Sequence, residues 1–165
     1  MIDLKNKDKK NCTGCYACSS ICPYHCIAME VDSEGFWYPK VDRDKCVECK
    51  MCINVCPTIN KIKIERNPIA YACINKDENV RLQSSSGGIF TLIAEKVIDN
   101  GGIVFGVEFD KEFKVVHNYI ENKESLYKFR GSKYLQSIIG ESYRKVKEFL
   151  DEGREVLFSG TPCQI

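Results

Sequence analysis

Two cysteine runs with the same spacing constrain this chain more than any other feature. The first run is Cys12–Pro23, the second is Cys46–Pro57, and each reads C-x2-C-x2-C-x3-C-P. A single C-x2-C pair is ambiguous between zinc, a redox dithiol and no function. Two complete runs of identical spacing are not ambiguous in this way, and they predict a metal-dependent module over residues 1–65.

This spacing is the one with which bacterial-type ferredoxins hold two 4Fe-4S clusters. The first three cysteines of a run lie on a short loop round one cluster. The fourth begins a helical turn and points away from this loop, so it binds the other cluster. A paired zinc module is the alternative, although it would leave half of the thiols unused. The expected ligand sets are Cys12, Cys15, Cys18 and Cys56 for one cluster, and Cys46, Cys49, Cys52 and Cys22 for the other.

Composition restricts the setting of these clusters. The chain has 165 residues, enough for a small cofactor domain and a modest second one. Its 24 basic and 23 acidic residues leave a net charge of +1, so no nucleic-acid partner is indicated. No apolar stretch resembles a secretion signal or could cross a bilayer. We therefore expect a cytoplasmic protein with reduced thiols and no direct membrane insertion.

Secondary structure within residues 1–65 is expected to be sparse. The β-prone runs Ile27–Asp32 and Phe36–Asp42 flank a Ser-Glu-Gly turn and predict a β-hairpin. A short helical turn is expected near Ser19–Ile21. Cys26 lies outside both ligand sets, and we expect it to be a small buried apolar residue.

A charged stretch with a proline, Lys61–Pro68, marks a change of composition, and a second domain is expected over residues 66–165. We expect Cys73 in the core and His117 half-exposed on a strand. The last predicted strand lacks a helix to cover it, which indicates a fragment truncated at its C-terminal end. The expected fold class is α+β, a two-cluster ferredoxin-like module followed by this α/β domain. Its strands are predicted at Ile69–Ile74, Gly102–Phe109, Lys114–Ile120 and Arg154–Gly160, and its helices at Ile89–Asn100, Asn122–Phe129 and Ile138–Leu150.

Two loops of the second domain carry groups that suit an anion. Ser85, Ser86, Gly87 and Gly88 precede a predicted helix, whose first N–H groups can seat a phosphate. The alternative there is an ordinary helix cap with a flexible loop. The second loop, Arg130–Tyr134, offers two cations and a hydroxyl, which suit a phosphate or an anionic ring edge, although a solvated turn is equally common.

Four motifs follow the cysteine runs in order, and with them the chain resembles the beta-subunit family of coenzyme F-420 hydrogenases and dehydrogenases, which includes a formate dehydrogenase beta subunit. The motifs are Ser84–Gly88, Gly101–Gly106, Gly131–Gln136 and Gly160–Gln164. The resemblance implies FAD, bound by the domain that begins near Ile69, and a deazaflavin coenzyme, F-420, that exchanges hydride with the flavin.

By the same resemblance, the flavin pocket includes Ser85–Gly88, Ser132 and Lys133. Cys163 is a candidate catalytic residue, as a ligand or redox group at the flavin's edge, with a structural cysteine as the alternative. The expected partners are a redox protein or other hydrogenase or dehydrogenase subunits. We therefore expect an oxidoreductase component that passes electrons between 4Fe-4S clusters and FAD. The alternative is an electron-carrying or docking module without flavin chemistry of its own.

Overall fold

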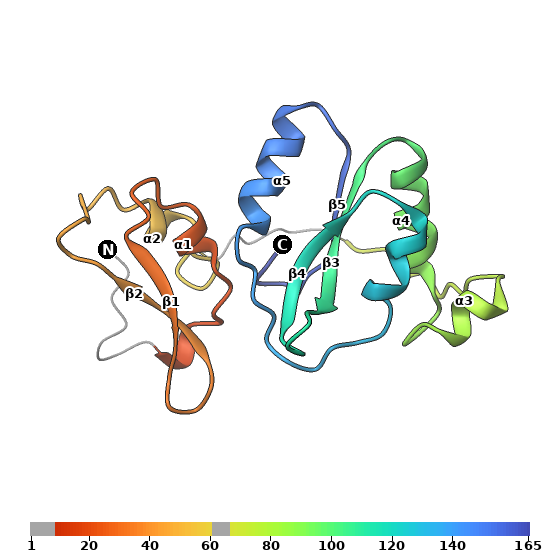
Figure 1. Cartoon of the computed structure of the whole chain (residues 1–165), viewed down its shortest axis with the longest axis horizontal. Helices are drawn as coiled ribbons and strands as arrows, with labels where there is room; N and C mark the ends of the chain where they lie inside the picture. Colours follow the sequence, from red (N-terminus) through yellow and green to blue (C-terminus); the bar gives the residue numbers. More distant parts are fainter. Residues whose placement is uncertain (1–8, 61–66) are drawn as a thin grey trace. The chain divides into compact units, whose positions relative to one another are not determined.

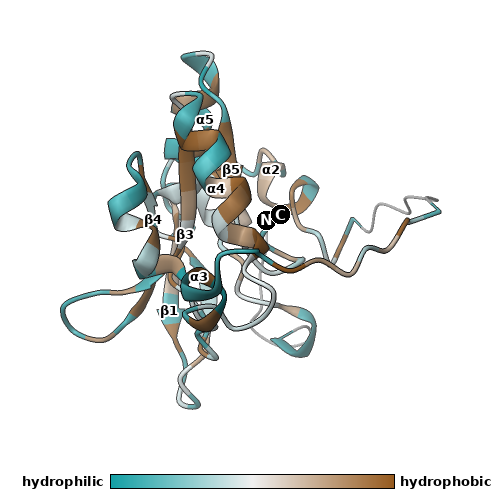
Figure 2. Ribbon diagram, turned by 90° about the vertical axis from the view of Figure 1, so that its right-hand side faces the viewer, coloured by the Kyte–Doolittle hydropathy of each residue, from teal (hydrophilic) through white to brown (hydrophobic). Residues whose placement is uncertain are grey.

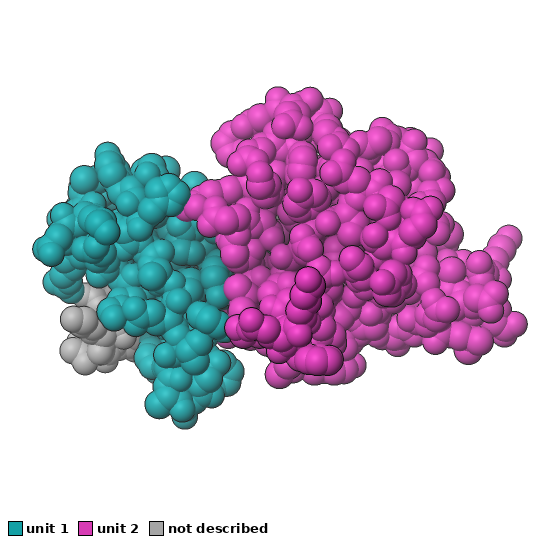
Figure 3. Space-filling model, in the orientation of Figure 1, with its two compact units in different colours: residues 1–65, 161–165 teal, residues 66–160 magenta. Residues whose placement is uncertain are grey.

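The computed structural model describes residues 9–60 and 67–165, so residues 1–8 and most of the stretch Lys61–Pro68 lie outside the description. The chain divides into two compact units, which Figure 3 shows in different colours. The first unit contains residues 1–65 and 161–165, and the second contains residues 66–160. The short segment 161–165 thus belongs to the first unit, whereas the sequence-based division places it in the second domain.

The first unit is built on a β-hairpin (Figure 1). β1 (Ile27–Val31) pairs antiparallel with β2 (Trp37–Val41). The turn between them closes on Asp32, whose Oδ1 accepts hydrogen bonds from the N–H groups of Glu34 and Phe36 at 3.0 and 3.1 Å. Aspartate stabilises turns by binding nearby backbone N–H groups in this way. The predicted hairpin is confirmed.

The two cysteine runs share one backbone conformation. A 3-10 turn, η1 (Lys9–Asn11), precedes the first run, and the short helices α1 (Ala17–Ser20) and α2 (Met51–Asn54) lie at equivalent places in the two runs. Tyr16 and Lys50, just before these helices, have left-handed φ angles of 66° and 64°. A left-handed angle costs a non-glycine residue roughly 1–2 kcal/mol. Its repetition in both runs indicates a loop shape that the fold imposes.

The second unit is a three-stranded mixed sheet with helices on both faces. β3 (Ile103–Phe109) is central, with β4 (Val115–Ile120) antiparallel on one side and β5 (Val156–Phe158) parallel on the other. Figure 1 shows α4 (Ile89–Asp99) on one side of the sheet and α5 (Ser142–Asp151) on the other. The remaining helices are α3 (Glu78–Leu82) and the 3-10 helix η2 (Lys123–Phe129).

β3 separates two apolar layers, because neighbouring residues of a strand point to opposite faces. On one face Val104 packs against Ala94 and Val97 of α4 and against Leu126 and Phe129 of η2. On the other face the fully buried ring of Phe105 meets aromatic rings from β4, α5 and β5. Figure 2 shows the apolar residues gathered in the strands, while α5 alternates between apolar and polar positions.

The prediction of a strand at Ile69–Ile74 is wrong. The segment is irregular, and Ile69, Tyr71 and Ile74 are 76%, 80% and 67% exposed. Cys73 is also exposed and not in the core. A strand forms only where it finds a hydrogen-bonded neighbour. Within the described residues the sheet has the order β4-β3-β5, and this segment pairs with neither edge.

The expectation that His117 is half-exposed is also wrong. Its side chain is buried, its Nε2 lies 3.2 Å from the carbonyl oxygen of Ser159, and its ring stacks on Phe158 with centroids 5.3 Å apart. The physical reason is that α5 covers this face of the sheet. Tyr143 of α5 stacks on Phe158, the same ring on which His117 stacks. This cover by α5 removes from solvent a residue that the sequence predicts to be half-exposed.

The other predicted elements of this unit are found, with altered ends. The expected helix at Ile138–Leu150 begins only at Ser142, because Gly140 turns the chain with a φ of +54°. Ile138 instead forms an isolated parallel bridge with Val116. The helix expected at Asn122–Phe129 is the 3-10 helix η2. Among the described residues, no helix is both long and apolar enough to traverse a bilayer.

Candidate metal centre

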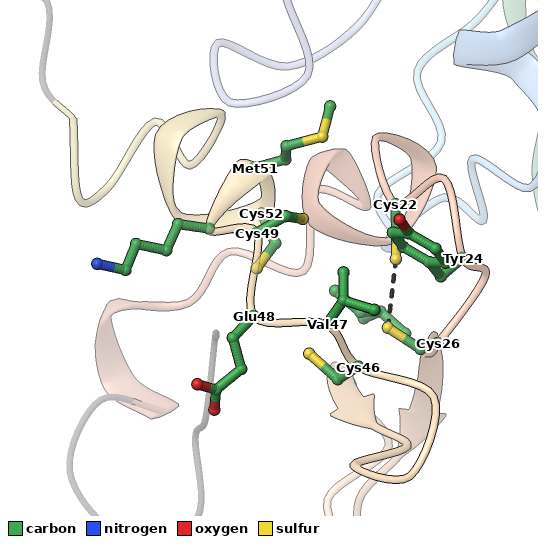
Figure 4. A pocket seen from close by; sticks show the side chains of 11 residues that line it. Cys22, Tyr24, Cys26, Cys46, Val47, Glu48, Cys49, Met51 and Cys52 are labelled. Atoms are coloured by element: carbon green, nitrogen blue, oxygen red, sulfur yellow. Dashed lines mark hydrogen bonds between the residues drawn. The ribbon is translucent and has the colours of Figure 1, made fainter.

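Five cysteines line one pocket in the first unit (Figure 4). Cys46, Cys49 and Cys52 come from the second run, where a loop leads into α2. Cys22 is the fourth cysteine of the first run, and Cys26 belongs to neither expected set. The fold therefore brings Cys22 to the three cysteines of the other run. We call Cys46, Cys49, Cys52 and Cys22 the second cluster site.

The fourth cysteine of the second run lies near the first run. Burial raises the pKa of the Cys12 and Cys15 thiols, and the nearby Cys56 contributes to both increases. The pKa of Cys18 rises to about 12, chiefly through burial, with smaller contributions from Cys15 and Cys12. These thiols are therefore close enough to interact. We call Cys12, Cys15, Cys18 and Cys56 the first cluster site.

Backbone N–H groups point at several of these sulfurs. The N–H groups of Gly14, Ala17 and Ser19 hydrogen-bond to Cys12, Cys15 and Cys18 and oppose the effect of burial on their pKa values. At Cys22 burial raises the pKa, but hydrogen bonds from the backbone and thiol of Cys26 and from the N–H groups of Tyr24 and His25 outweigh it, so the net shift is downward.

This donor set fits an iron–sulfur cluster. Loops that turn successive N–H groups inward form concave seats for anions, including iron–sulfur clusters. Hydrogen bonds to sulfur also set the reduction potential of such clusters. Within residues 9–60 and 67–165, no three His, Cys, Asp or Glu side chains converge closely enough for one metal ion. A 4Fe-4S cluster differs because its thiolates bind separate irons.

The two candidate anion-binding loops of the second unit lie side by side. The N–H group of Ser132 donates a hydrogen bond to Ser85 Oγ at 2.6 Å. Gly88, with a left-handed φ of 72°, precedes α4, so the loop of Ser85 and Ser86 lies at the N-terminal end of that helix. Two of the loops that the sequence singles out are therefore brought together, and Ser85, Ser86 and Ser132 are exposed there.

The cations of these loops are engaged within the second unit. Arg130 donates to the side-chain oxygens of Gln83 and Thr91. Lys133 Nζ donates to the carbonyl oxygens of Lys128 and Arg130, each at 2.9 Å, and burial lowers its pKa. In this structure both cations therefore hold the loops in shape.

Gly87 has a packing role that is independent of any ligand. A Cβ atom there would lie 2.3 Å from the carbonyl oxygen of Cys73. Asn75 fixes the same approach, because its N–H donates to the carbonyl oxygen of Gly87 at 2.6 Å and its Nδ2 to that of Gly88 at 3.2 Å. Sequence reasoning missed Asn75, which no local motif marks.

Cys163 lies in the segment that joins the first unit. Its charge contributes to the raised pKa values of Cys12 and Cys15, after burial and hydrogen bonding, so it lies near the first cluster site. Its Sγ is 3.1 Å from Thr161 Oγ1. This neighbourhood was not expected from the sequence.

Comparison with protein families agrees with this architecture. Residues 11–60 match the family model of the 4Fe-4S dicluster domain, so the first unit is of the class of two-cluster iron–sulfur proteins. Residues 70–141 match the model of the N-terminal part of the coenzyme F-420 hydrogenase/dehydrogenase beta subunit. The two matches follow one another in the order that the sequence predicts, and the resemblance seen in the sequence is confirmed. No curated protein matches the chain.

Proposed function

We propose that the chain is the electron-transfer component of a flavin-dependent oxidoreductase. One 4Fe-4S cluster is held at the first cluster site and the other at the second cluster site. The observation that carries this assignment is the position of Cys22 in one pocket with Cys46, Cys49 and Cys52. A cysteine from one run among three from the other is what a cross-linked pair of cluster loops requires.

When bound, each 4Fe-4S cluster accepts and returns one electron. The protein supplies the thiolates, a buried setting and the N–H donors that tune the potential. At the first cluster site these donors include Gly14, Ala17 and Ser19. At the second they include the residues that follow Cys22. The two sites together provide a path for single electrons through the first unit.

We further propose that FAD binds at the loops of Ser85–Gly88 and of Ser132 and Lys133. The proposal is supported by their juxtaposition, by the N-terminal end of α4 beside them, and by the match of residues 70–141 to the beta-subunit family model. FAD would convert between single electrons and hydride, with a deazaflavin such as coenzyme F-420 as the hydride partner. Other hydrogenase or dehydrogenase subunits, or a redox protein, are the proposed partners.

A second candidate function is an electron-carrying and docking module without flavin chemistry. The exposed apolar side chains of Ile69, Tyr71 and Ile74 favour it, because a segment with such side chains is suited to contact another protein. In this case the second unit serves as a binding scaffold. The clusters of the first unit keep the same role.

Anaerobic reconstitution with iron, sulfide and FAD tests these proposals. We expect about eight irons and eight sulfides per chain, as two 4Fe-4S clusters require, together with flavin that remains bound through gel filtration. Clusters without flavin, both in this chain of 165 residues and in any longer natural form, would favour the docking alternative. Tightly bound zinc without sulfide would contradict the cluster assignment itself.

A further inference from the structure

The pocket at the second cluster site contains one thiol more than a cluster needs. Cys26 Sγ lies 3.3 Å from Cys22 Sγ, at hydrogen-bond distance for sulfur (Figure 4). Its side chain is only 4% exposed, and it lines the same pocket as Cys46, Cys49 and Cys52. The thiol therefore faces the site and not solvent.

Regular structure holds Cys26 in this place. His25 has a left-handed φ of 48°, and its N–H donates to the carbonyl oxygen of Cys22, so the chain folds back after Cys22. Cys26 directly precedes β1, and its carbonyl oxygen accepts a hydrogen bond of 2.8 Å from the N–H of Asp42, just after β2. The end of the hairpin thus fixes the distance between the two sulfurs.

The contact between the sulfurs determines what Cys26 can do. The two sulfurs are 3.3 Å apart, which is within hydrogen-bond distance for sulfur, so one thiol can donate to the other. A cluster ligand must be a thiolate. When Cys22 is the ligand, the Cys26 thiol is placed to donate an S–H···S hydrogen bond to it. Such hydrogen bonds to ligand sulfur adjust the potential of a cluster.

We propose that Cys26 is a fifth thiol of the second cluster site, a hydrogen-bond donor to Cys22 in the intact protein and its replacement as a ligand when Cys22 is lost. The proposal rests on the cluster assignment of the proposed function. In the replacement, Cys26 releases its proton to solvent and its sulfur bonds to the iron that Cys22 would have held. No electron is transferred in this exchange.

The internal repeat supplies a matched control. Cys26 lies four residues after Cys22 in the first run. The equivalent position in the second run, four residues after Cys56, is Asn60. Its Nδ2 donates to the carbonyl oxygens of Ile53 and Asn54, at 2.6 and 3.2 Å, and it carries no thiol. Cys56 therefore has no equivalent replacement in its own run. Cys163, which lies near the first cluster site, is changed to alanine in every variant so that it cannot interfere.

Replacement is tested by the iron and sulfide content of Cys22→Ala, Cys22→Ala with Cys26→Ala, and Cys56→Ala, all reconstituted anaerobically with reductant. We expect Cys22→Ala to keep about eight irons per chain, and the other two variants about four. A Cys22→Ala chain that loses as much iron as the double variant, or does not fold, would overturn replacement. If the parent chain holds no clusters, the proposed function has failed instead.

The donor role is tested with the four proposed ligands intact. We expect Cys26→Ala to lower the reduction potential of one cluster, because the hydrogen bond that offsets the negative charge of the ligand is gone. Cys26→Ser keeps a donor and should lie closer to the parent. Electron paramagnetic resonance during a redox titration gives both potentials. Unchanged potentials in Cys26→Ala would overturn the donor role.

Discussion

His117 in β4 is a buried histidine with only one of its ring nitrogens paired. Its Nε2 lies 3.2 Å from the carbonyl oxygen of Ser159, so Nε2 carries the proton, while Nδ1 has no hydrogen-bond partner within the described residues. Burial lowers its pKa, and the hydrogen bond to Ser159 opposes this only in part. Protonation would place a charged, buried N–H at Nδ1 without a hydrogen-bond acceptor within the described residues, which is costly.

We expect the free energy of unfolding of the second unit to fall as the pH drops below about 6.5, the pKa of histidine in an unfolded chain. Below that pH the unfolded chain takes up a proton that the folded unit does not, and the slope approaches about 1.4 kcal/mol per pH unit. Above it the contribution is constant. Urea unfolding followed through NMR signals of β3 between pH 5.5 and 7.5 measures this slope.

His117→Phe is the matched control for this pH dependence. Phenylalanine can keep the stacking on Phe158 but cannot take up a proton. We expect the variant to show a flatter pH dependence over the same range. An equally steep slope in His117→Phe would show that the dependence comes from other groups.

At the same scale, the spacing of the cysteines could predict two ligand sets but not the neighbour of Cys22. Spacing determines which thiols a loop can present, whereas the 3.3 Å contact with Cys26 depends on how the chain folds back and on the hairpin that follows. Cys26 was expected to be buried, and it is. What it is buried against is a property of the tertiary structure.

Among the elements, β3 and η2 make a close contact in the second unit. Gly106 of β3 faces Phe129 of η2, and a Cβ atom at Gly106 would lie 2.5 Å from the ring. We expect Gly106→Ala to destabilise the second unit by about 1–3 kcal/mol, as overpacking does in other cores. Urea unfolding gives the difference. Adding Phe129→Leu should recover part of the loss, and a double variant without recovery would show that the contact with the ring is not the cause.

Elements with local signals could be predicted from the sequence, while the irregular segment Ile69–Ile74 could not. α4 has apolar residues at helical spacing and ends at Asn100 and Gly101, where the left-handed φ of 77° suits glycine. The hairpin has its own turn residues. The apolar residues of Ile69–Ile74 indicate only a propensity for β-strand. Whether a strand forms depends on a neighbouring strand that is distant in sequence. The short distance between Ser85 and Ser132 could likewise not be predicted from either loop alone.

In the whole molecule, the two compact units have different kinds of core. The core of the first unit consists of Cys18, Cys22, Cys26, Cys52 and Ile27, with few large apolar side chains around them. The second unit buries Phe105, Ile103 and Leu126 completely. A small module whose core is mostly thiols depends on bound metal for folding, as other metal-stapled domains do.

The fourth cysteine of each run is proposed to bind the cluster of the other run. The iron content of two double variants tests this central proposal most directly. Cys18→Ala with Cys56→Ala removes two ligands of the first cluster site only, whereas Cys52→Ala with Cys56→Ala removes one ligand from each site. After anaerobic reconstitution, with Cys163→Ala in both, we expect about four irons per chain in the former and almost none in the latter. The reverse result would mean that each run holds its own cluster, and it would contradict the account.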